Sequence, residues 1–467
     1  MAKRSKRKKQ RSLLQQVCHP DAAGVDIAAE EIVIAIPEGR EAHSVRSFGT
    51  FNADLRDAIT WLQESNIRTV AMESTGNYWV PLYDFLQEAG IEVCLVNARH
   101  VKGVPGRKTD VQDAQWLQQL HTAGLLNASF VPDKDIRRMR YLYRQRDDLI
   151  RSGAREIQHM QKAYNEMNVQ LHHVISDIDG LSGRRITEAI IDGRRDPLEL
   201  AMLRHPSCKT PLEDVLKALD GNYCDEYVFV LRQAYERWKE SQRQIAEAER
   251  FLGTLLAAYQ VDETPAARSK GSTQAEFPFD LNLTTPSPKL KQATKHEPLF
   301  DVRKQAFRIY GTDLSRIPGI SSGVLGALLT EVGGAHAFKE RFRNAKHFTS
   351  WLGLCPDNRI SGNKLLGSKT RSVKSRLAYQ LRMASMTLWR NESAIGDYCR
   401  RMKAKLGKAE GITATAHKLA RILYTLIVTG KSYDDQIITQ MPEKARNKRL
   451  RNLQKQAEKL GMQIVAA

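Results

Sequence analysis

The chain has 467 residues, which is too long for one compact core, so we expect about two to four folded units joined by linkers. Its 72 lysine and arginine residues outnumber 53 aspartate and glutamate residues, and the net charge of +19 favours nucleic acid as a partner. No apolar run approaches the roughly 18 to 20 residues that cross a bilayer, so we expect a cytoplasmic protein without a membrane partner. The six cysteines lie far apart, which disfavours a zinc knuckle or a disulfide framework.

The first folded domain is expected at residues 21–132, after a basic tail at residues 1–20. The sequence GVDIAAEEIVIAIPEG predicts two strands joined by a tight turn, because β-branched residues alternate on both sides of two glutamates. Further strands are expected at residues 44–51 and in TVAMEST and IEVCLVN, and helices at residues 54–65, 78–89 and 109–123. This βββαβαβα order is that of the ribonuclease-H-like, or RuvC-like, fold, whose active site lies at strand ends.

The rest of the chain is expected to be mainly helical, which gives an α/β plus α protein. Residues 133–261 carry apolar side chains at helical spacing and predict a helical or coiled-coil segment suited to oligomerisation. Residues 262–300 are rich in Pro, Ser, Thr and Lys, which is typical of a linker. Residues 301–441 predict a second folded domain, and a basic tail follows at residues 442–467. The helices expected in that second domain lie near Val324–Val332, Ala345–Leu352, Arg376–Arg390 and Ala414–Thr429.

Four carboxylates fall at positions that a ribonuclease-H-like topology brings together. Asp26 lies in the first predicted strand, Glu73 ends a later strand, and Asp110 and Asp113 lie three residues apart on one helix face. Carboxylates this close repel one another unless hard cations lie between them, and oxygen ligands suit Mg²⁺ or Mn²⁺. Two such ions about 4 Å apart assist phosphodiester cleavage. Singly, each carboxylate is more often a helix cap or a solvated charge, and only the complete set favours a metal site.

Two cations, Arg107 and Lys108, precede Asp110 and are predicted to hold the scissile phosphate. A second candidate site lies in the segment CPDNRISGNKLLGSKTRSVKSR, where Ser361 precedes Gly362. A serine hydroxyl there could attack a phosphate and form a covalent phosphoserine, although a Ser-Gly pair by itself is more often a turn. The cations of this segment are candidates for binding nucleic acid: Arg359, Lys364, Lys369, Arg371, Lys374 and Arg376.

Further upstream, the segment DLSRIPGISSGVLGALLTEVG has a Pro-Gly turn before a predicted helix. It is similar to a helix-hairpin-helix element, whose backbone NH groups hold DNA phosphate. An ordinary helix start explains the same residues equally well. Both interpretations stay open from the sequence.

Several of these motifs resemble the DEDD-type insertion-sequence transposases, specifically the insertion sequence 110 family and its 1111 subgroup, which are bridge-RNA-guided serine recombinases. The motifs that carry the resemblance are GVDIA, MESTGNYW and GRKTDVQDAQWL, followed by IPGI and SWLGLCPDNRISGNK. The resemblance implies that Asp26, Glu73, Asp110 and Asp113 are the metal-binding catalytic carboxylates and that Ser361 is the nucleophile. It also implies a guide RNA, DNA at the element ends and target, and a homo-oligomer, a dimer or a tetramer. In that oligomer the serine of one protomer would meet the carboxylates of another.

One departure from the family lies beyond the serine. Many members have a Lys-x-Gly step there, whereas this chain has Arg371, Ser372 and Val373 in the corresponding stretch. We therefore expect this loop to differ in conformation from that of the family.

Two other functions are compatible with the sequence. A structure-specific junction endonuclease would use the four carboxylates with water as the nucleophile, and a non-catalytic nucleic-acid-binding protein would use them only structurally. An actin-like or sugar-kinase ATPase is disfavoured, because Ile27, Ala28 and Ala29 follow Asp26 where a Gly-rich phosphate loop is needed. The leading hypothesis is a transposase that cuts and rejoins DNA in the cytoplasm, at the nucleoid of a prokaryote.

Overall fold

The computed structural model describes residues 17–74, 76–97, 110–259, 297–362 and 364–435, together with residues 457 and 461. The chain divides into two units, Met1–Val131 and Pro132–Ala467. Three parts of the predicted organisation lie outside the described residues. They are residues 1–16 of the first basic tail, residues 262–296 of the linker, and nearly all of the second basic tail.

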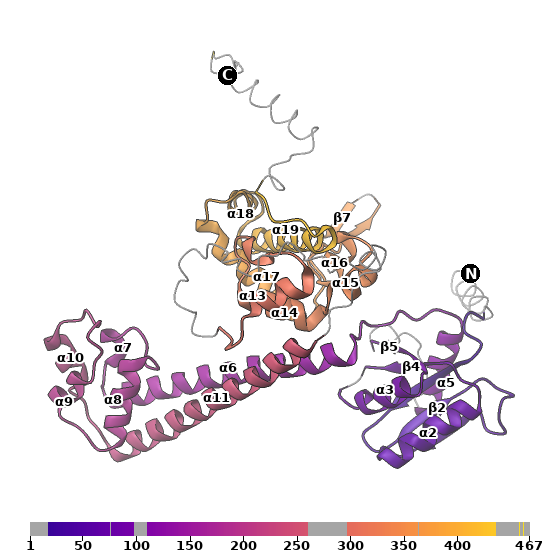
Figure 1. Cartoon of the computed structure of the whole chain (residues 1–467), viewed down its shortest axis with the longest axis horizontal. Coiled ribbons are helices and arrows are strands. Elements are labelled where there is room, and N and C mark those ends of the chain that lie inside the picture. Colours follow the sequence, from indigo (N-terminus) through magenta and orange to yellow (C-terminus); the bar gives the residue numbers. More distant parts are fainter. Residues whose placement is uncertain are drawn as a thin grey trace, which may run out of the picture. The chain divides into compact units, whose positions relative to one another are not determined.

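The first unit, drawn in indigo and purple in Figure 1, is built on a five-stranded sheet. The strand order is β3-β2-β1-β4-β5. Its strands are β1 (Ala22–Ile27), β2 (Ile32–Ala35), β3 (Val45–Phe48), β4 (Thr69–Glu73) and β5 (Glu92–Val96). Strands β1, β2 and β3 pair antiparallel, whereas β1, β4 and β5 pair parallel. The described helices of this unit are α2 (Asn52–Glu64), α3 (Trp79–Glu88) and α5 (Asp110–Thr122). The predicted order of strands and helices is confirmed, and it is compatible with a RuvC-like domain.

Both faces of the central strand β1 are covered. Ala23 and Val25 are fully buried in an apolar cluster that includes residues of α2 and α3. Gly24 points to the other face, where a Cβ would lie 2.2 Å from the carbonyl oxygen of Ala114 and from the amide nitrogen of Gln118. Only glycine therefore allows α5 to lie this close to β1. Burial on both faces is typical of the parallel part of a sheet.

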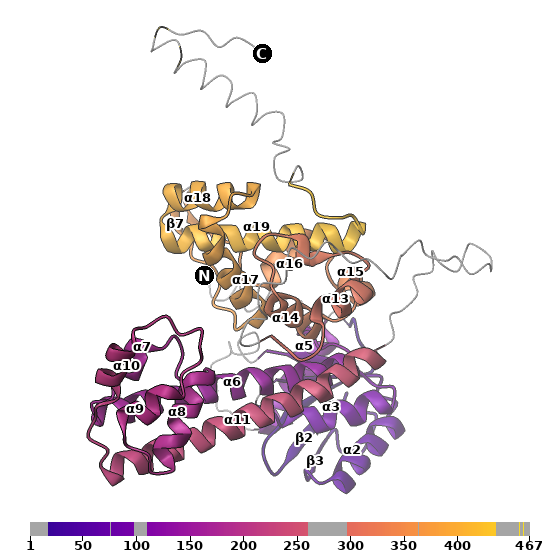
Figure 2. The same ribbon diagram turned by 60° about the vertical axis from the view of Figure 1, so that its left-hand side comes forward.

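Two long helices open the second unit and pack against each other along their length (Figures 1 and 2). They are α6 (Lys134–Glu166) and α11 (Asp225–Ala258). They run antiparallel, because Arg146 of α6 pairs with Glu249 of α11, while Glu156 further along α6 pairs with the earlier residue Arg237. The helical prediction for this segment is confirmed, and the two helices form a hairpin within one chain.

Four short helices fill the connection between α6 and α11 and form a cluster with its own apolar core. The sequence analysis predicted one long helical segment here and did not distinguish these four helices within it. Breakers explain the interruption: Asn168 adopts a positive φ of 54°, Gly193 a φ of 97°, and Pro197 begins one of the new helices. The four helices are α7 (Leu171–Val174), α8 (Leu181–Ile191), α9 (Pro197–Met202) and α10 (Leu212–Leu219).

The C-terminal part of the second unit is mainly helical, as expected, and its elements surround α14, whose residues 324–332 are all buried. All four predicted helices are present, and α19 begins six residues earlier than expected, directly after Gly407. Helices α13, α15 and α18 and the strands β6 and β7 were not predicted. The elements are α13 (Val302–Tyr310), η1 (Leu314–Arg316), α14 (Ser322–Val332), α15 (Ala335–Arg341), α16 (Ala345–Trp351), β6 (Arg359–Ser361), β7 (Lys364–Gly367), α17 (Arg376–Thr387), η2 (Leu388–Arg390), α18 (Ala394–Leu406) and α19 (Lys408–Thr429).

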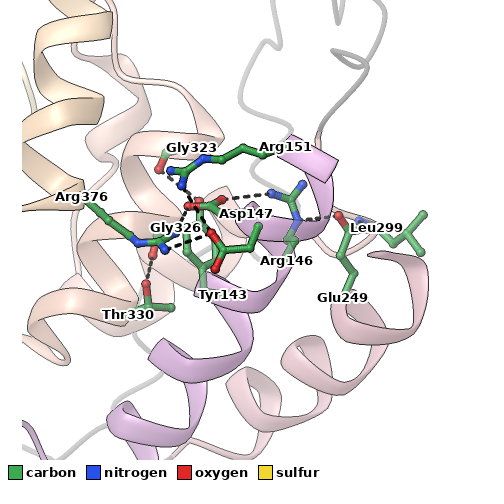
Figure 3. Close-up of polar contacts among 11 residues, drawn as sticks. Tyr143, Arg146, Asp147, Arg151, Glu249, Leu299, Gly323, Gly326, Thr330 and Arg376 are labelled. Atoms are coloured by element: carbon green, nitrogen blue, oxygen red, sulfur yellow. Dashed lines mark hydrogen bonds and ion pairs between the residues drawn. The ribbon is translucent and has the colours of Figure 1, made fainter. Parts of the chain in front are cut away.

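A network of ion pairs and hydrogen bonds joins the base of the helical hairpin to α14 and α17 (Figure 3). Arg376, the first residue of α17, donates to Asp147 of α6 over 2.6 Å, and the Tyr143 hydroxyl donates to the Gly323 carbonyl oxygen over 3.2 Å. Next to them, Arg146 and Glu249 form an ion pair of 2.6 Å in which each side chain is only 5% exposed. The hairpin and the C-terminal helices thus share one core and one polar network.

We expect Glu249→Ala to lower the free energy of unfolding by about 3 kcal/mol, because it leaves the buried Arg146 guanidinium without its carboxylate partner. Glu249 also accepts the backbone NH of Leu299 over 3.0 Å, and that bond is lost too. The matched control is Glu240→Ala on the same helix, whose pair with Arg243 is exposed to solvent and should contribute little to stability. Urea titration followed by circular dichroism measures both. Equal effects of the two variants would contradict the prediction.

Within the described ranges, no helix combines the length and the apolar composition needed to span a bilayer.

Candidate active site and nucleic-acid interface

Two of the predicted carboxylates lie side by side at the ends of neighbouring strands. Strands β1 and β4 are parallel and pair Val25 with Met72. Asp26 and Glu73 are the next residues on each strand, so they occupy adjacent positions about 5 Å apart across the sheet. Both are half-buried, and both make interactions within the protein. They alternate with the buried Val25 and Met72, and their side chains therefore point to the opposite face of the sheet, on which α5 lies.

Helix α5 brings its first turn to the same end of the sheet. Gln118 of α5 donates to the Ala22 carbonyl oxygen over 3.4 Å, and the backbone NH of Cys18 donates to Thr122 over 2.7 Å. Gly24, further along β1, contacts Ala114 and Gln118. The helix therefore runs opposite to β1. Its N-terminal residues, Asp110 and Asp113, lie toward the strand end that carries Asp26 and Glu73.

His121 fixes the other end of α5 to the sheet. Its Nε2 lies 2.9 Å from the Thr69 hydroxyl oxygen, and its ring stacks on His19 with centroids 4.9 Å apart. Burial, with a smaller contribution from His19, lowers the pKa of His121 to about 4. The imidazole is therefore neutral at physiological pH, and its contact with Thr69 is a neutral hydrogen bond.

This pKa predicts that the first unit loses stability as the pH falls from 6.5, the ordinary value of histidine, to about 4. In that window the unfolded chain binds a proton at His121 and the folded chain does not, so acid favours unfolding. The loss should reach at most about 3 kcal/mol. Thermal melts across this pH range should show a smaller decrease for His121→Gln than for the wild type. Parallel curves for the two proteins would show that His121 does not titrate in this way.

The metal set itself remains a proposal. Among the residues that are described with their side chains, no three Asp, Glu, His or Cys groups are placed closely enough to hold a metal ion. Asp113 is half-buried one turn into α5, and Asp110 is described as the first residue of the helix. Arg107 and Lys108 lie outside the described residues. The oxygen-rich donor set at this end of the sheet fits a hard divalent cation.

Ser361 lies at the tip of a β-hairpin. It is the last residue of β6 and pairs directly with Lys364, the first residue of β7. Gly362 follows with a φ of +52°, the left-handed conformation that a two-residue hairpin turn requires. Ser361, Gly362 and Lys364 are all exposed. The Ser-Gly pair is thus a turn, and the turn presents the serine hydroxyl to solvent.

The cations of this segment fall into two groups. Lys364, Lys369 and Lys374 are exposed around the hairpin. Arg371 donates instead to the carbonyl oxygen and the hydroxyl of Ser350 over 2.6 and 2.9 Å. Arg376 pairs with Asp147, so in this structure carboxylates hold its guanidinium. Arg359 begins β6.

The stretch that departs from the family pattern anchors the hairpin. Arg371 binds Ser350 of α16, and Val373 packs on Gly353, where an added Cβ would lie 2.7 Å from Val373. Gly353 has a φ of +66°. The Arg-Ser-Val sequence therefore fixes the base of the hairpin against the end of α16.

Two family models match the chain. One, described as a transposase and representing DEDD enzymes of the IS110 family, covers residues 23–168, and another, described as the transposase IS116/IS110/IS902 family, covers residues 311–400. The protein is a DNA transposase. The two matches occur in the order that the sequence motifs predicted. No curated protein sequence matches the chain.

The matched regions include the candidate sites of the transposase. The first contains Asp26, Glu73, Asp110 and Asp113, and the second contains Ser361. The two sets belong to different units of the chain. Helix α6 lies inside the first match. Helix α11 and the four short helices between α6 and α11 fall outside both matches.

The sequence analysis did not predict two features of the structure. One is the pairing of Arg140 and Arg144 with Glu331, which holds α6 on α14 over distances of 3.3 and 2.8 Å. No local pattern indicates this pairing, because about 190 residues separate the partners. The other is the solvent-facing side of α17, which carries Tyr379. The sequence does carry a signal for this surface, because residues 358–391, which include α17, contain no aspartate or glutamate.

Proposed function

We propose that the transposase cuts and rejoins DNA at mobile-element ends and target with a carboxylate site and a serine nucleophile. The observation that carries the proposal is the adjacency of Asp26 and Glu73 on parallel strands, at the end of the sheet toward which α5 brings Asp110 and Asp113. These four residues would hold Mg²⁺ or Mn²⁺. When bound there, the metal would supply charge stabilisation to a phosphate undergoing transfer.

Ser361 is the proposed nucleophile because the hairpin turn exposes its hydroxyl. In this step Oγ of Ser361 forms a bond to phosphorus, and the bond from phosphorus to the leaving deoxyribose oxygen breaks. The serine proton passes to water at this exposed position, and the leaving strand takes up a proton as a hydroxyl. The hydroxyl of the incoming strand then attacks the phosphoserine and releases Ser361. The phosphodiester energy is conserved, so rejoining needs no nucleotide cofactor.

Lys364 is the cation best placed to assist Ser361. The two residues are a direct cross-strand pair, whose Cβ atoms lie about 5 Å apart on the same side of the hairpin. An ammonium group there can contact a non-bridging oxygen of the phosphate that Ser361 attacks. We propose Lys369, Lys374 and Arg359 as further phosphate contacts, with Arg107 and Lys108 serving the carboxylate site. Arg371 and Arg376 would have to leave their present partners to do the same.

A guide RNA and a homo-oligomer complete the proposal. The net charge of +19 supports a large polyanionic partner, and the family resemblance supports a bridge RNA as part of it. Ser361 and the carboxylates belong to separate units, which is compatible with a site composed from two protomers of a dimer or a tetramer. Because α6 and α11 pair within one chain, assembly through this hairpin would use its outer faces.

The experiment that tests the proposal maps the DNA attachment site. The transposase is incubated with Mg²⁺, an RNA transcribed from the DNA flanking its gene, and an element-end duplex that is nicked so that rejoining is blocked. Protease and nuclease digestion followed by tandem mass spectrometry should find a nucleotide phosphate on the peptide that contains Ser361. Cleaved DNA without any attached peptide would instead support a junction endonuclease that uses water, and attachment to another residue would overturn the serine assignment.

A further inference from the structure

The solvent-facing side of α17 is apolar. Tyr379, Met383 and Met386 lie at the i, i+4 and i+7 positions of the helix and are 56%, 42% and 45% exposed. Trp389 follows in η2 and is 48% exposed. The opposite side of α17, including Leu377 and Leu381, is buried in the core. Large apolar side chains seldom line the exposed face of a helix without a binding partner.

Cations accompany these apolar side chains. The guanidinium carbon of Arg390 lies 4.8 Å from the centroid of the Trp389 ring, and the ammonium nitrogen of Lys403 lies 5.6 Å from it. Arg382 lies three residues after Tyr379 and directly before Met383, and its side chain is half-buried. Two positive groups therefore lie against the indole, and Trp389 is still largely exposed to solvent.

The charge of the surrounding sequence is one-sided. Residues 358–391 contain eight lysine and arginine residues and no aspartate or glutamate. Aromatic and thioether groups together with an excess of cations complement a polyanion that has flat apolar parts. An unpaired nucleic-acid strand has both properties, because its bases expose their faces and its phosphates lie alongside.

We propose that Tyr379, Met383, Met386 and Trp389, here called the stacking face, bind the bases of an unpaired DNA strand while Arg382, Arg390 and Lys403 contact its phosphates. This inference rests on the proposed function, because cutting and rejoining releases a strand end that must leave one duplex before it enters another. Duplex DNA hides its base faces and cannot stack on this surface. Stacking tolerates any sequence, as a reaction at different targets requires.

Equilibrium binding tests the stacking face. All proteins carry Ser361→Ala so that no chemistry occurs, and the probe is a fluorescent oligothymidylate of about 16 nucleotides, followed by anisotropy over a range of salt concentrations. Tyr379→Ala and Trp389→Ala should each weaken binding about tenfold and leave the slope of log affinity against log salt unchanged. Arg382→Gln should instead reduce that slope by about 0.7, the contribution of one phosphate on a single strand. Duplex DNA should bind equally well to all variants.

Two further variants distinguish a loss of stacking from a general loss of aromatic surface and from a folding defect. Tyr141→Ala removes an aromatic side chain on α6 that is 74% exposed, and it should bind oligothymidylate like the parent protein. Trp389→Phe keeps an aromatic ring and should retain most of the affinity that Trp389→Ala loses.

Three results would overturn the proposal. The first is that Tyr379→Ala and Trp389→Ala weaken oligothymidylate binding no more than Tyr141→Ala does. The second is that these variants weaken the binding of oligouridylate alone. The third is that they change the oligomeric state of the protein and leave oligothymidylate binding unchanged. The second would assign the face to RNA, and the third to a copy of the same chain. None of them bears on the mapping of DNA to Ser361, which needs cleavage and not this surface.

Discussion

Asp26→Asn and Glu73→Gln are each expected to reduce strand cleavage by at least about a thousandfold. The substitutions keep the shape of the side chains and remove one negative charge from adjacent positions on β1 and β4. Loss of metal-based charge stabilisation of about 4 kcal/mol corresponds to that factor. Because neither residue belongs to the apolar core, the folded structure should persist. Quantification of cleaved element-end DNA at saturating Mg²⁺ measures the effect.

A control on the neighbouring strand makes this result specific. Glu92 begins β5 and pairs with Thr69, at the opposite end of the same parallel strands. Glu92→Gln removes the same charge from the same sheet and should leave cleavage unchanged. A direct metal readout is available as well, since Mn²⁺ should raise the melting temperature of the wild type and of Glu92→Gln but not that of Asp26→Asn. Unimpaired cleavage by Asp26→Asn would show that the carboxylates are structural.

The α/β unit was predictable because its local patterns agree with its topology. Alternating β-branched residues mark β1 and β2, and the strand and helix order specifies which strands are neighbours. The adjacency of Asp26 and Glu73 follows from parallel pairing once the order is known. The role of Gly24 was not predictable, because a glycine inside a strand says nothing about which helix lies over it until the packing of α5 is seen.

The second unit was less predictable because its decisive contacts are distant in sequence. Arg376 lies among the cations around Ser361 and looks like one of them, yet more than 220 residues separate it from Asp147, with which it pairs. The apolar spacing of α6 and α11 predicts a pairing surface and does not say whether the partner helix belongs to the same chain. The exposed tyrosine and methionines of α17 have helical spacing, which by itself indicates a buried face, and only the structure shows that solvent covers them.

Ser361→Ala is expected to abolish the covalent protein–DNA species completely while leaving the fold and the binding of DNA intact. The hydroxyl is exposed at the tip of a hairpin, so its removal should change the free energy of unfolding by no more than about 0.5 kcal/mol. Alanine has no atom that can bond to phosphorus, and water cannot take its place in a reaction that must keep the strand end attached. Denaturing gel electrophoresis of the trapped, labelled DNA measures the adduct.

Ser368→Ala provides the matched control, since Ser368 is exposed just beyond β7 in the same cationic segment. It should form the adduct at the rate of the wild type. The pair of variants also separates the two enzymatic mechanisms, because a water-dependent nuclease would cut DNA equally well with either alanine. An adduct that persists in Ser361→Ala would mean that another nucleophile attacks the phosphate. The exposed hairpin would then serve only to hold DNA through Lys364 and its neighbouring lysines, and the carboxylate site alone would have to explain the chemistry.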